Sequence, residues 1–414
     1  MTGSLLGQGL ALLVSPIITR LFDPTDFSSF EQYAFLLSVL TVVVTGKYEF
    51  AIMHPRERED ARHLAGLAMR LAVWVSAVIL GLLLFSSGVI ADYYHSPDLK
   101  YWLWTLPFAL VAVSVYNVVN LWFSRIKNYK VAATSKTLYS ASGEPVKIIA
   151  GLIKPSVGGL VIGTLAGHIT AAVYSFKKFR QDEPKTFFQL SKKRLRELAR
   201  EHRDYPRYAM TGSVLNNMAQ WAHVAVFAFF YGEKAIIPIG FIALTRRIFF
   251  NPLGILSTSY GQVFYQRISD IESATELRTF FIKNLFRFLG FASVLVVIVQ
   301  LLPPWSLGFV FGEKWTDALV YLKILSYWYA LNFVLSTLSF IFYRLQLQWY
   351  TLAVDIFHFL IVIFAFWWAW HSGMDEIRAV KAMVWAKVIY LVLNGCAVIY
   401  FLNRNVKNQL RSSH

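Results

Sequence analysis

Long apolar runs separated by short polar gaps make up most of this chain. The runs reach 18 residues or more, the length that an α-helix needs to cross a hydrocarbon core of about 30 Å. Only helices or closed barrels can cross, because every backbone N–H and C=O must be paired there. Alternating ten-residue strands are absent, so the pattern predicts an all-α integral membrane protein.

The runs predict about twelve transmembrane helices in two lobes of six. Their approximate bounds are 4–21, 31–53, 64–90, 101–123, 131–153, 157–176, 208–231, 235–262, 281–303, 318–343, 350–371 and 378–402. The longest gap separates the lobes, which gives an N-terminal lobe at 1–176, a basic cytoplasmic linker at 177–207, a C-terminal lobe at 208–402 and a cytoplasmic tail at 403–414. The helix ends TRLFDPTDFSSF and FFYGEKAIIPIGF form a faint repeat, and two related bundles are an architecture that many transporters share.

Lysine and arginine residues gather in alternate gaps. One set of gaps, together with the C-terminal tail, holds 23 of them against 7 in the other set, and the run from Lys177 to Arg207 alone holds eleven. The positive-inside rule places the richer set and both termini in the cytoplasm. Within the linker, Ser191–Arg203 predicts a basic amphipathic helix, which suits either an anionic leaflet surface or a solvated topology determinant.

Composition excludes several classes of function. The chain is 56% hydrophobic and 15% charged, whereas soluble domains carry about 25% charged residues. The net charge of +16 lies in membrane-flanking gaps, so no nucleic-acid partner is expected. A single cysteine, Cys396, excludes intrachain disulfides and cysteine metal sites. P-loop, GxSxG and HExxH motifs are absent, so no ATP hydrolysis, cofactor or metal is expected.

Charges inside the predicted spans are costly, and helix 131–153 carries the clearest group. Lys136, Ser140, Gly143, Glu144 and Lys147 recur at helical spacing and share one face. Glu144 and Lys147 lie three residues apart and can pair, which leaves Lys136 as a candidate unpaired cation. The face is interpreted either as the polar wall of a water-filled cavity or as a buried ion pair that holds helices together.

Two further polar groups lie in the second lobe. Asn216, Asn217 and Gln220 form an amide row on helix 208–231, suited to hydrogen bonds with sugar hydroxyls or with a neighbouring helix. Arg246 and Arg247 lie near the middle of helix 235–262, too deep for snorkelling. Because arginine binds phosphate bidentately, this pair predicts an anionic substrate or a partner carboxylate nearby.

The remaining candidate charges are more ambiguous. Lys47 and Glu49 lie near the cytoplasmic end of helix 31–53, and Arg20 lies at a helix end where snorkelling explains it. Asp355 and His358 form an i,i+3 pair on helix 350–371. That pair is a candidate for ion coupling, and hydrogen bonding within the bundle is the alternative.

Five stretches resemble one known family. They are SPIITRLFDPTDFSSF at 15–30, KYEFAIMHPRERED at 47–60, ELAREHRDYPRYAMTGSVLNNMAQ at 197–220, NPLGILSTSYGQVFYQRISD at 251–270 and FGEKWTDALVYLKIL at 311–325. Together they resemble the oligosaccharide-lipid flippases of bacterial polysaccharide export, the O-antigen translocases, within the superfamily that includes MATE-type exporters. One departure is the very short segment before the first helix.

The resemblance implies a MATE-like bundle around a central cavity lined by the first, second, seventh and eighth helices. An undecaprenyl-diphosphate-linked oligosaccharide would cross the bacterial inner membrane by alternating access. Membrane lipids and polysaccharide polymerase or export proteins are the other partners implied. On this frame the cavity candidates are Arg20, Lys47, Glu49, Asn216, Asn217, Gln220, Arg246 and Arg247.

Two alternative functions remain open. A MATE-like cation-coupled multidrug exporter would place carboxylates in its cavity, but Glu49, Glu144 and Asp355 are the only deep acids. A membrane-embedded glycan polymerase or ligase would need a sizeable external loop with acid or base groups. The external gaps in this sequence are short, which disfavours the enzyme.

Overall fold

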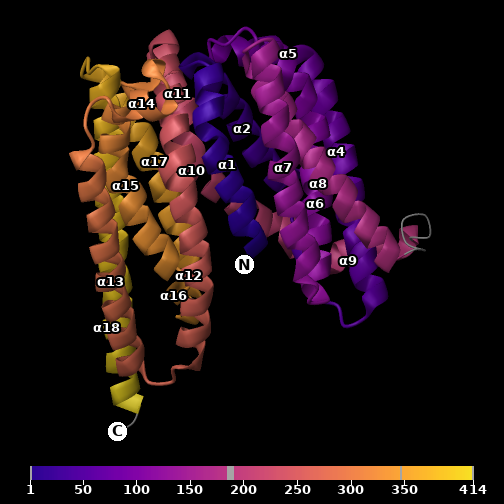
Figure 1. Cartoon of the computed structure of the whole chain (residues 1–414). Coiled ribbons are helices and arrows are strands. Elements are labelled where there is room, and N and C mark those ends of the chain that lie inside the picture. Colours follow the sequence, from indigo (N-terminus) through magenta and orange to yellow (C-terminus); the bar gives the residue numbers. More distant parts are fainter. Residues whose placement is uncertain (1, 184–190, 346, 413–414) are drawn as a thin grey trace. The chain divides into compact units, whose positions relative to one another are not determined.

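A computed structural model describes residues 2–183, 191–345 and 347–412, and the regular secondary structure of these residues is helical (Figure 1). The chain forms two compact units, unit 1 at Met1–Gly240 and unit 2 at Phe241–His414. Residues 184–190 of the predicted linker lie outside the described residues.

Within the described residues, unit 1 contains ten α-helices and the start of an eleventh. They are α1 (Thr2–Leu21), α2 (Pro24–Val44), α3 (Tyr48–Ala51), α4 (Arg58–Tyr93), α5 (Leu99–Trp102), α6 (Leu106–Arg125), α7 (Tyr129–Ile153), α8 (Val157–Asp182), α9 (Lys192–Glu201), α10 (Met210–Tyr231) and the first half of α11 (Ile236–Thr245). The turns η1 (Leu103–Thr105) and η3 (Gly232–Ala235) are 3₁₀-helical, and η2 (Tyr205–Ala209) is π-helical.

Unit 2 starts within α11 and continues through a π turn. Its elements are η4 (Arg246–Phe250), α12 (Asn251–Asp270), α13 (Ala274–Leu301), α14 (Ser306–Phe311), η5 (Glu313–Trp315), α15 (Ala318–Leu338), α16 (Ile341–Arg344), α17 (Gln348–His371) and α18 (Glu376–Ser412). α13 and α18 run antiparallel, because Arg278 Nε donates to Asn403 Oδ1 and the Ala274 N–H donates to Gln409 Oε1.

The predicted all-α membrane architecture is confirmed, since each predicted helix matches a helix among the described residues. Among the described residues, nine helical stretches are long and apolar enough to cross a membrane, and one of them, Tyr205–Asp270, covers two predicted helices. The bounds 31–53 are wrong at both ends. α2 begins at Pro24, where the Asp26 carboxylate accepts from the Asp23 N–H, and it ends before Gly46 and Lys47, whose φ angles are 59° and 60°.

Small residues let α7 and α8 pack closely in unit 1. Gly159, Gly163 and Gly167 recur every fourth residue on α8, a spacing that brings membrane helices together. A Cβ added at Gly163 would lie 2.3 Å from Lys147 Cγ and 2.8 Å from the Gly143 carbonyl oxygen. This contact therefore requires glycine.

Helix α9 is part of unit 1. Its apolar side chains Leu195 and Leu198 are buried, and Leu198 joins the apolar core formed by α3, α4 and α6. Arg194 makes two hydrogen bonds to the Asp60 carboxylate, at 2.8 and 2.6 Å, and these raise the pKa of Arg194 above its usual range. The predicted amphipathic helix is present, but its apolar face packs on protein and is not free to enter a lipid leaflet.

Candidate functional site

The arginine pair of unit 2 begins a π-helical turn. Pro252, just after the turn, has no N–H to donate and its ring crowds the carbonyl four residues earlier, so a wider turn relieves the contact. Single π turns of this kind are frequent at functional sites. Arg246 is buried with its guanidinium 5.7 Å from the Phe250 ring, whereas Arg247 is half-buried.

A second basic residue close to Arg246 is a lysine on α18. Lys387 is 0% exposed, and within the described chain its Nζ has no hydrogen-bond partner. The Nζ lies 3.5 Å from the centroid of the Trp328 ring on α15, and the charge of Arg246 acts on it. Lys387 is absent from the predicted site, although it is the one charged residue between Lys381 and Arg404 in the sequence. A single lysine within a long apolar run is costly to bury, and this pattern could have identified Lys387 as a candidate from the sequence.

Helix α17 adds the predicted histidine. His358 is 3% exposed and stacks on Tyr390, with ring centroids 4.6 Å apart and an interplanar angle of 12°. Its Nε2 is buried without a hydrogen-bond partner among the described residues, and the charge of Lys387 acts on it. Asp355 is half-buried one turn earlier, and its charge acts on Tyr390. We call Arg246, His358 and Lys387 the unit-2 cationic cluster.

Aromatic rings surround this cluster. The Phe250 ring lies 5.9 Å from Trp328 and 5.0 Å from Tyr329, and the hydroxyls of Thr245 and Tyr329 are 3.3 Å apart. Ring faces attract cations but accept no strong hydrogen bonds. Lys387 Nζ, which has no hydrogen-bond partner among the described residues, therefore keeps its donors available to an anion.

The amide row on α10 belongs to unit 1. Asn217 accepts a hydrogen bond from Ser38 on α2 at 2.8 Å, and its amide group donates to the Ser213 carbonyl at 3.2 Å. Asn216 is exposed, and Gln220 Oε1 is buried with no hydrogen-bond partner among the described residues. One member of the row thus joins two helices, which is the alternative interpretation, while Gln220 keeps an unused acceptor.

The polar face of α7 is mostly internal. Lys147 Nζ lies 2.9 Å from Glu144 Oε1, and both residues are under 5% exposed. The same Nζ lies 5.9 Å from the Phe30 ring of α2, whereas Lys136 is exposed. This geometry favours the buried ion pair over the wall of a cavity for Glu144 and Lys147.

The remaining candidates lie at helix ends of unit 1. Lys47 occupies the left-handed turn after α2, with its Nζ 5.0 Å from the Phe50 ring. Burial lowers the pKa of Lys47, and the Glu49 carboxylate opposes that effect. Glu49 is 4% exposed, and its Oε2 has no hydrogen-bond partner in the described part of the chain. Arg20 is exposed in the last turn of α1.

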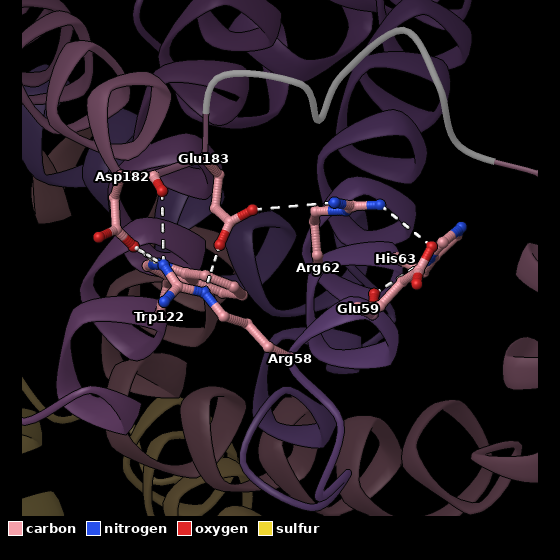
Figure 2. A network of polar contacts seen from close by, with 7 residues as sticks. All are labelled: Arg58, Glu59, Arg62, His63, Trp122, Asp182 and Glu183. Carbon is pink, nitrogen blue, oxygen red and sulfur yellow. Dashed lines mark hydrogen bonds and ion pairs between the residues drawn. The ribbon is translucent and has the colours of Figure 1, made fainter.

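A charged network at the start of α4 holds the end of α8 (Figure 2). Arg58 pairs with Asp182 at 2.8 Å and with Glu183, while Trp122 Nε1 donates to Asp182 Oδ2 at 2.9 Å. Arg62 lies 3.9 Å from the other Glu183 oxygen. With the Arg194–Asp60 pair, α4 thereby fixes the chain on both sides of residues 184–190. Within the described residues, no group of three or more His, Cys, Asp or Glu side chains is placed to hold a metal ion.

Comparisons with known proteins add a family and a fold. Residues 17–320 match the family described as "Polysaccharide biosynthesis protein". No curated protein sequence matches the chain.

Several solved structures share the fold. Lipid II flippase MurJ in an inward closed conformation is 13% identical with a TM-score of 0.70, over 99% of this chain and 91% of that one. An inward-facing multidrug resistance MATE family transporter of the MOP superfamily is 12% identical with a TM-score of 0.67, over 98% and 96%. A MOP superfamily transporter from Pyrococcus furiosus is 12% identical with a TM-score of 0.60, over 98% and 94%. At these identities the likeness shows the fold alone, which is that of MATE-like transporters.

Proposed function

We propose, from the premise that the chain belongs to the polysaccharide biosynthesis protein family, that it is a flippase for an undecaprenyl-diphosphate-linked oligosaccharide. The substrate would be an O-antigen, capsule or exopolysaccharide repeat unit, carried from the cytoplasmic to the periplasmic leaflet of a bacterial inner membrane. The fold shared with a lipid II flippase supports a lipid-linked substrate. The charge asymmetry of the gaps supports an orientation with both termini in the cytoplasm.

The observation that carries this proposal is the unit-2 cationic cluster with the adjacent Arg247. A guanidinium forms paired, charge-assisted hydrogen bonds with phosphate oxygens. Attraction between unlike charges grows where water is scarce, and the guanidinium of Arg246 is buried. A diphosphate supplies the negative charge that these surroundings favour.

The other predicted residues take supporting roles in the proposal. The free acceptor of Gln220 and the exposed amide of Asn216 suit the hydroxyl groups of a sugar. Alternating access needs two states that differ in affinity for the substrate, since a ligand shifts an equilibrium only by differential binding. Downhill movement, ion coupling and the membrane potential are all compatible with this scheme.

A MATE-like multidrug exporter is the main alternative, because that class shares the fold. Cationic drugs call for carboxylates. Glu144 is paired with Lys147, but Glu31 and Glu49 are also buried, so the expectation that Glu49, Glu144 and Asp355 are the only deep acids is wrong, and the number of buried acids does not exclude the exporter. A glycan polymerase or ligase is disfavoured by short connections at the predicted external ends, such as 94–98, 154–156 and 372–375. The family match favours the flippase over the exporter.

Complementation tests the proposal. In a strain that lacks the gene, lipid-linked oligosaccharide should accumulate on the cytoplasmic leaflet, and the wild-type gene should restore surface glycan. The double variant Arg246→Ala with Arg247→Ala should lower export by roughly ten- to a hundredfold, the factor expected for lost charged hydrogen bonds.

Arg267→Ala, which removes an exposed arginine of α12, is the matched control. Full export by the double variant at normal protein level would remove the arginine pair from the mechanism. Restored drug resistance without restored glycan would favour the multidrug exporter.

A further inference from the structure

We propose that Lys387 is a substrate-linked protonation site. Its Nζ takes up a proton when a diphosphate occupies the unit-2 cationic cluster, and it releases the proton when the diphosphate leaves. The inference rests on the proposed function, because it takes a diphosphate as the ligand. It adds a role for a residue outside the predicted site.

The first observation is the isolation of the Lys387 side chain. An ammonium group carries three hydrogen-bond donors, yet Nζ is buried and, among the described residues, meets no acceptor. The Nζ lies over the face of the Trp328 ring, 3.5 Å from its centroid. A buried charge is normally paired or hydrogen-bonded, so a lysine in this position calls for a function.

The second observation is the set of groups that face Lys387 from the surrounding elements. η4 brings the permanent positive charge of Arg246, α17 brings His358, and α15 brings Trp328. Asp355 lies one turn before His358 on α17, where its charge acts on Tyr390 of α18.

Helix α13 also packs on α18, and it meets Lys387 with apolar residues. The hydrogen bonds that join Ala274 to Gln409 and Arg278 to Asn403 fix the antiparallel register. That register places the stretch 293–297 level with Lys387, and this stretch carries no charge. Within the described residues, the charged or titratable groups that act on Lys387 or respond to it are therefore Arg246 and His358.

The chemistry distinguishes the two basic residues. A guanidinium keeps its charge in proteins, whereas a lysine amine readily gains or loses its proton when its surroundings change. A diphosphate at Arg246 would add negative potential near Nζ. The amine lone pair then binds one proton from solvent to form an ammonium, and that proton returns to solvent when the diphosphate departs.

Linkage fixes the sign of the resulting pH dependence. The ligand-bound protein holds more protons than the free protein, so affinity for a diphosphate must rise as the pH falls. If one proton is taken up with the ligand, the affinity for the diphosphate changes by at most about tenfold per pH unit. A fixed positive charge at residue 387 would give affinity without this pH dependence.

Trp328 provides a direct reporter, because its ring lies against Nζ. The purified full-length protein is titrated in detergent while tryptophan emission is recorded, with farnesyl diphosphate present or absent as the probe. The part due to Trp328 is obtained by subtracting the emission of Trp328→Phe. We expect a transition that moves to higher pH when the probe is present and that disappears in Lys387→Met and Lys387→Arg.

Calorimetry in two buffers of different ionisation enthalpy then counts the protons taken up with the probe, at a pH where the probe is fully ionised. Wild type and the exposed control Lys381→Met should take up protons, and Lys387→Met and Lys387→Arg should not. Lys387→Met should fold, because an apolar side chain of similar length replaces a buried amine that has no hydrogen-bond partner among the described residues. Size-exclusion profiles check that both Lys387 variants are folded.

Three outcomes would overturn the proposal. They are a wild-type emission transition that does not respond to the probe, proton uptake retained in Lys387→Met, and a pH-dependent affinity retained in Lys387→Arg. Failure of the proposed function is a separate result, because it is seen as normal glycan export in the strain that lacks the gene. The Trp328 titration needs no glycan and would stand in that case.

Discussion

Two buried lysines in this chain meet their surroundings in opposite ways. Lys147 lies 2.9 Å from the Glu144 carboxylate, one helical turn away on the same helix. Lys387 lies against the Trp328 ring, with no hydrogen-bond partner for its Nζ among the described residues. Burying an ion pair costs desolvation that the partner largely offsets, whereas a lone charge has no such compensation. The first arrangement is typical of a structural contact and the second of a functional one.

The structural contact can be tested by removing each partner of the Glu144–Lys147 pair. Glu144→Gln or Lys147→Met alone leaves one uncompensated buried charge and should destabilise the protein by about 3–5 kcal/mol. The double variant removes both charges of the pair. Its loss of stability should therefore be clearly smaller than the summed losses of the two single variants. Thermal unfolding of the purified protein in detergent measures all four forms. Additive losses would show that the two side chains are not coupled.

The sequence revealed these two lysines unequally. The i,i+3 spacing of Glu144 and Lys147 predicts their pairing, because such residues are neighbours on a helix. No comparable local rule identifies the surroundings of Lys387. Its neighbours Arg246, Trp328 and His358 come from three other elements, so only the tertiary structure brings them together.

Among the elements, α7 and α8 pack closely through glycines on both helices. Small residues allow this approach, and the lysine of the buried pair lies directly over one of them. The Lys147 stem would meet any side chain added at Gly163. The glycines of α8 therefore position the Glu144–Lys147 pair as well as the helices.

Gly163→Ala should destabilise unit 1 by roughly 1–3 kcal/mol, the usual range for overpacking. The added Cβ would lie 2.8 Å from the Gly143 carbonyl oxygen, which cannot move without shifting α7. Gly81→Ala on α4 is the control, because nothing lies within 4 Å of its added Cβ. That change should be neutral or stabilising by about 0.5–1 kcal/mol, since alanine favours helix. Equal thermal midpoints for the two variants would contradict the tight α7–α8 contact.

Hydropathy predicted which stretches form helices, but capping residues and prolines determine where those helices begin and end. The residues Asp23, Pro24 and Asp26 mark a helix start that the apolar run from 31 onward does not reach. The π turn at Arg246–Phe250 precedes Pro252, a signal that a hydropathy pattern does not register. The sequence predicts the apolar face of α9 but does not tell whether lipid or protein covers it. In the structure, other helices of unit 1 cover that face.

At the scale of the whole molecule, the uneven distribution of basic residues between the two sets of gaps predicts how the chain is oriented in the membrane. Basic residues in alternate gaps predict a specific topology, with 23 on the cytoplasmic side and 7 outside. The structure supplies the helices but contains no membrane, so the orientation stays a prediction. The network of Arg58, Asp182 and Glu183 and the docked α9 lie at the end that the rule assigns to the cytoplasm.

Cysteine labelling tests this topology, because the chain has a single native cysteine. In a Cys396→Ser background, Lys100→Cys and Lys154→Cys lie at exposed positions on the predicted external side, and Lys130→Cys and Arg203→Cys at exposed positions on the other. A membrane-impermeant maleimide added to intact spheroplasts should label the first two and reach the second two only after lysis. If Arg203→Cys reacts before lysis, the orientation is reversed, and the leaflet from which a diphosphate could approach Arg246 changes with it. If one external and one internal site react alike, the predicted set of twelve crossings fails, because sites on the same side are separated by an even number of spans and the prediction separates these sites by an odd number.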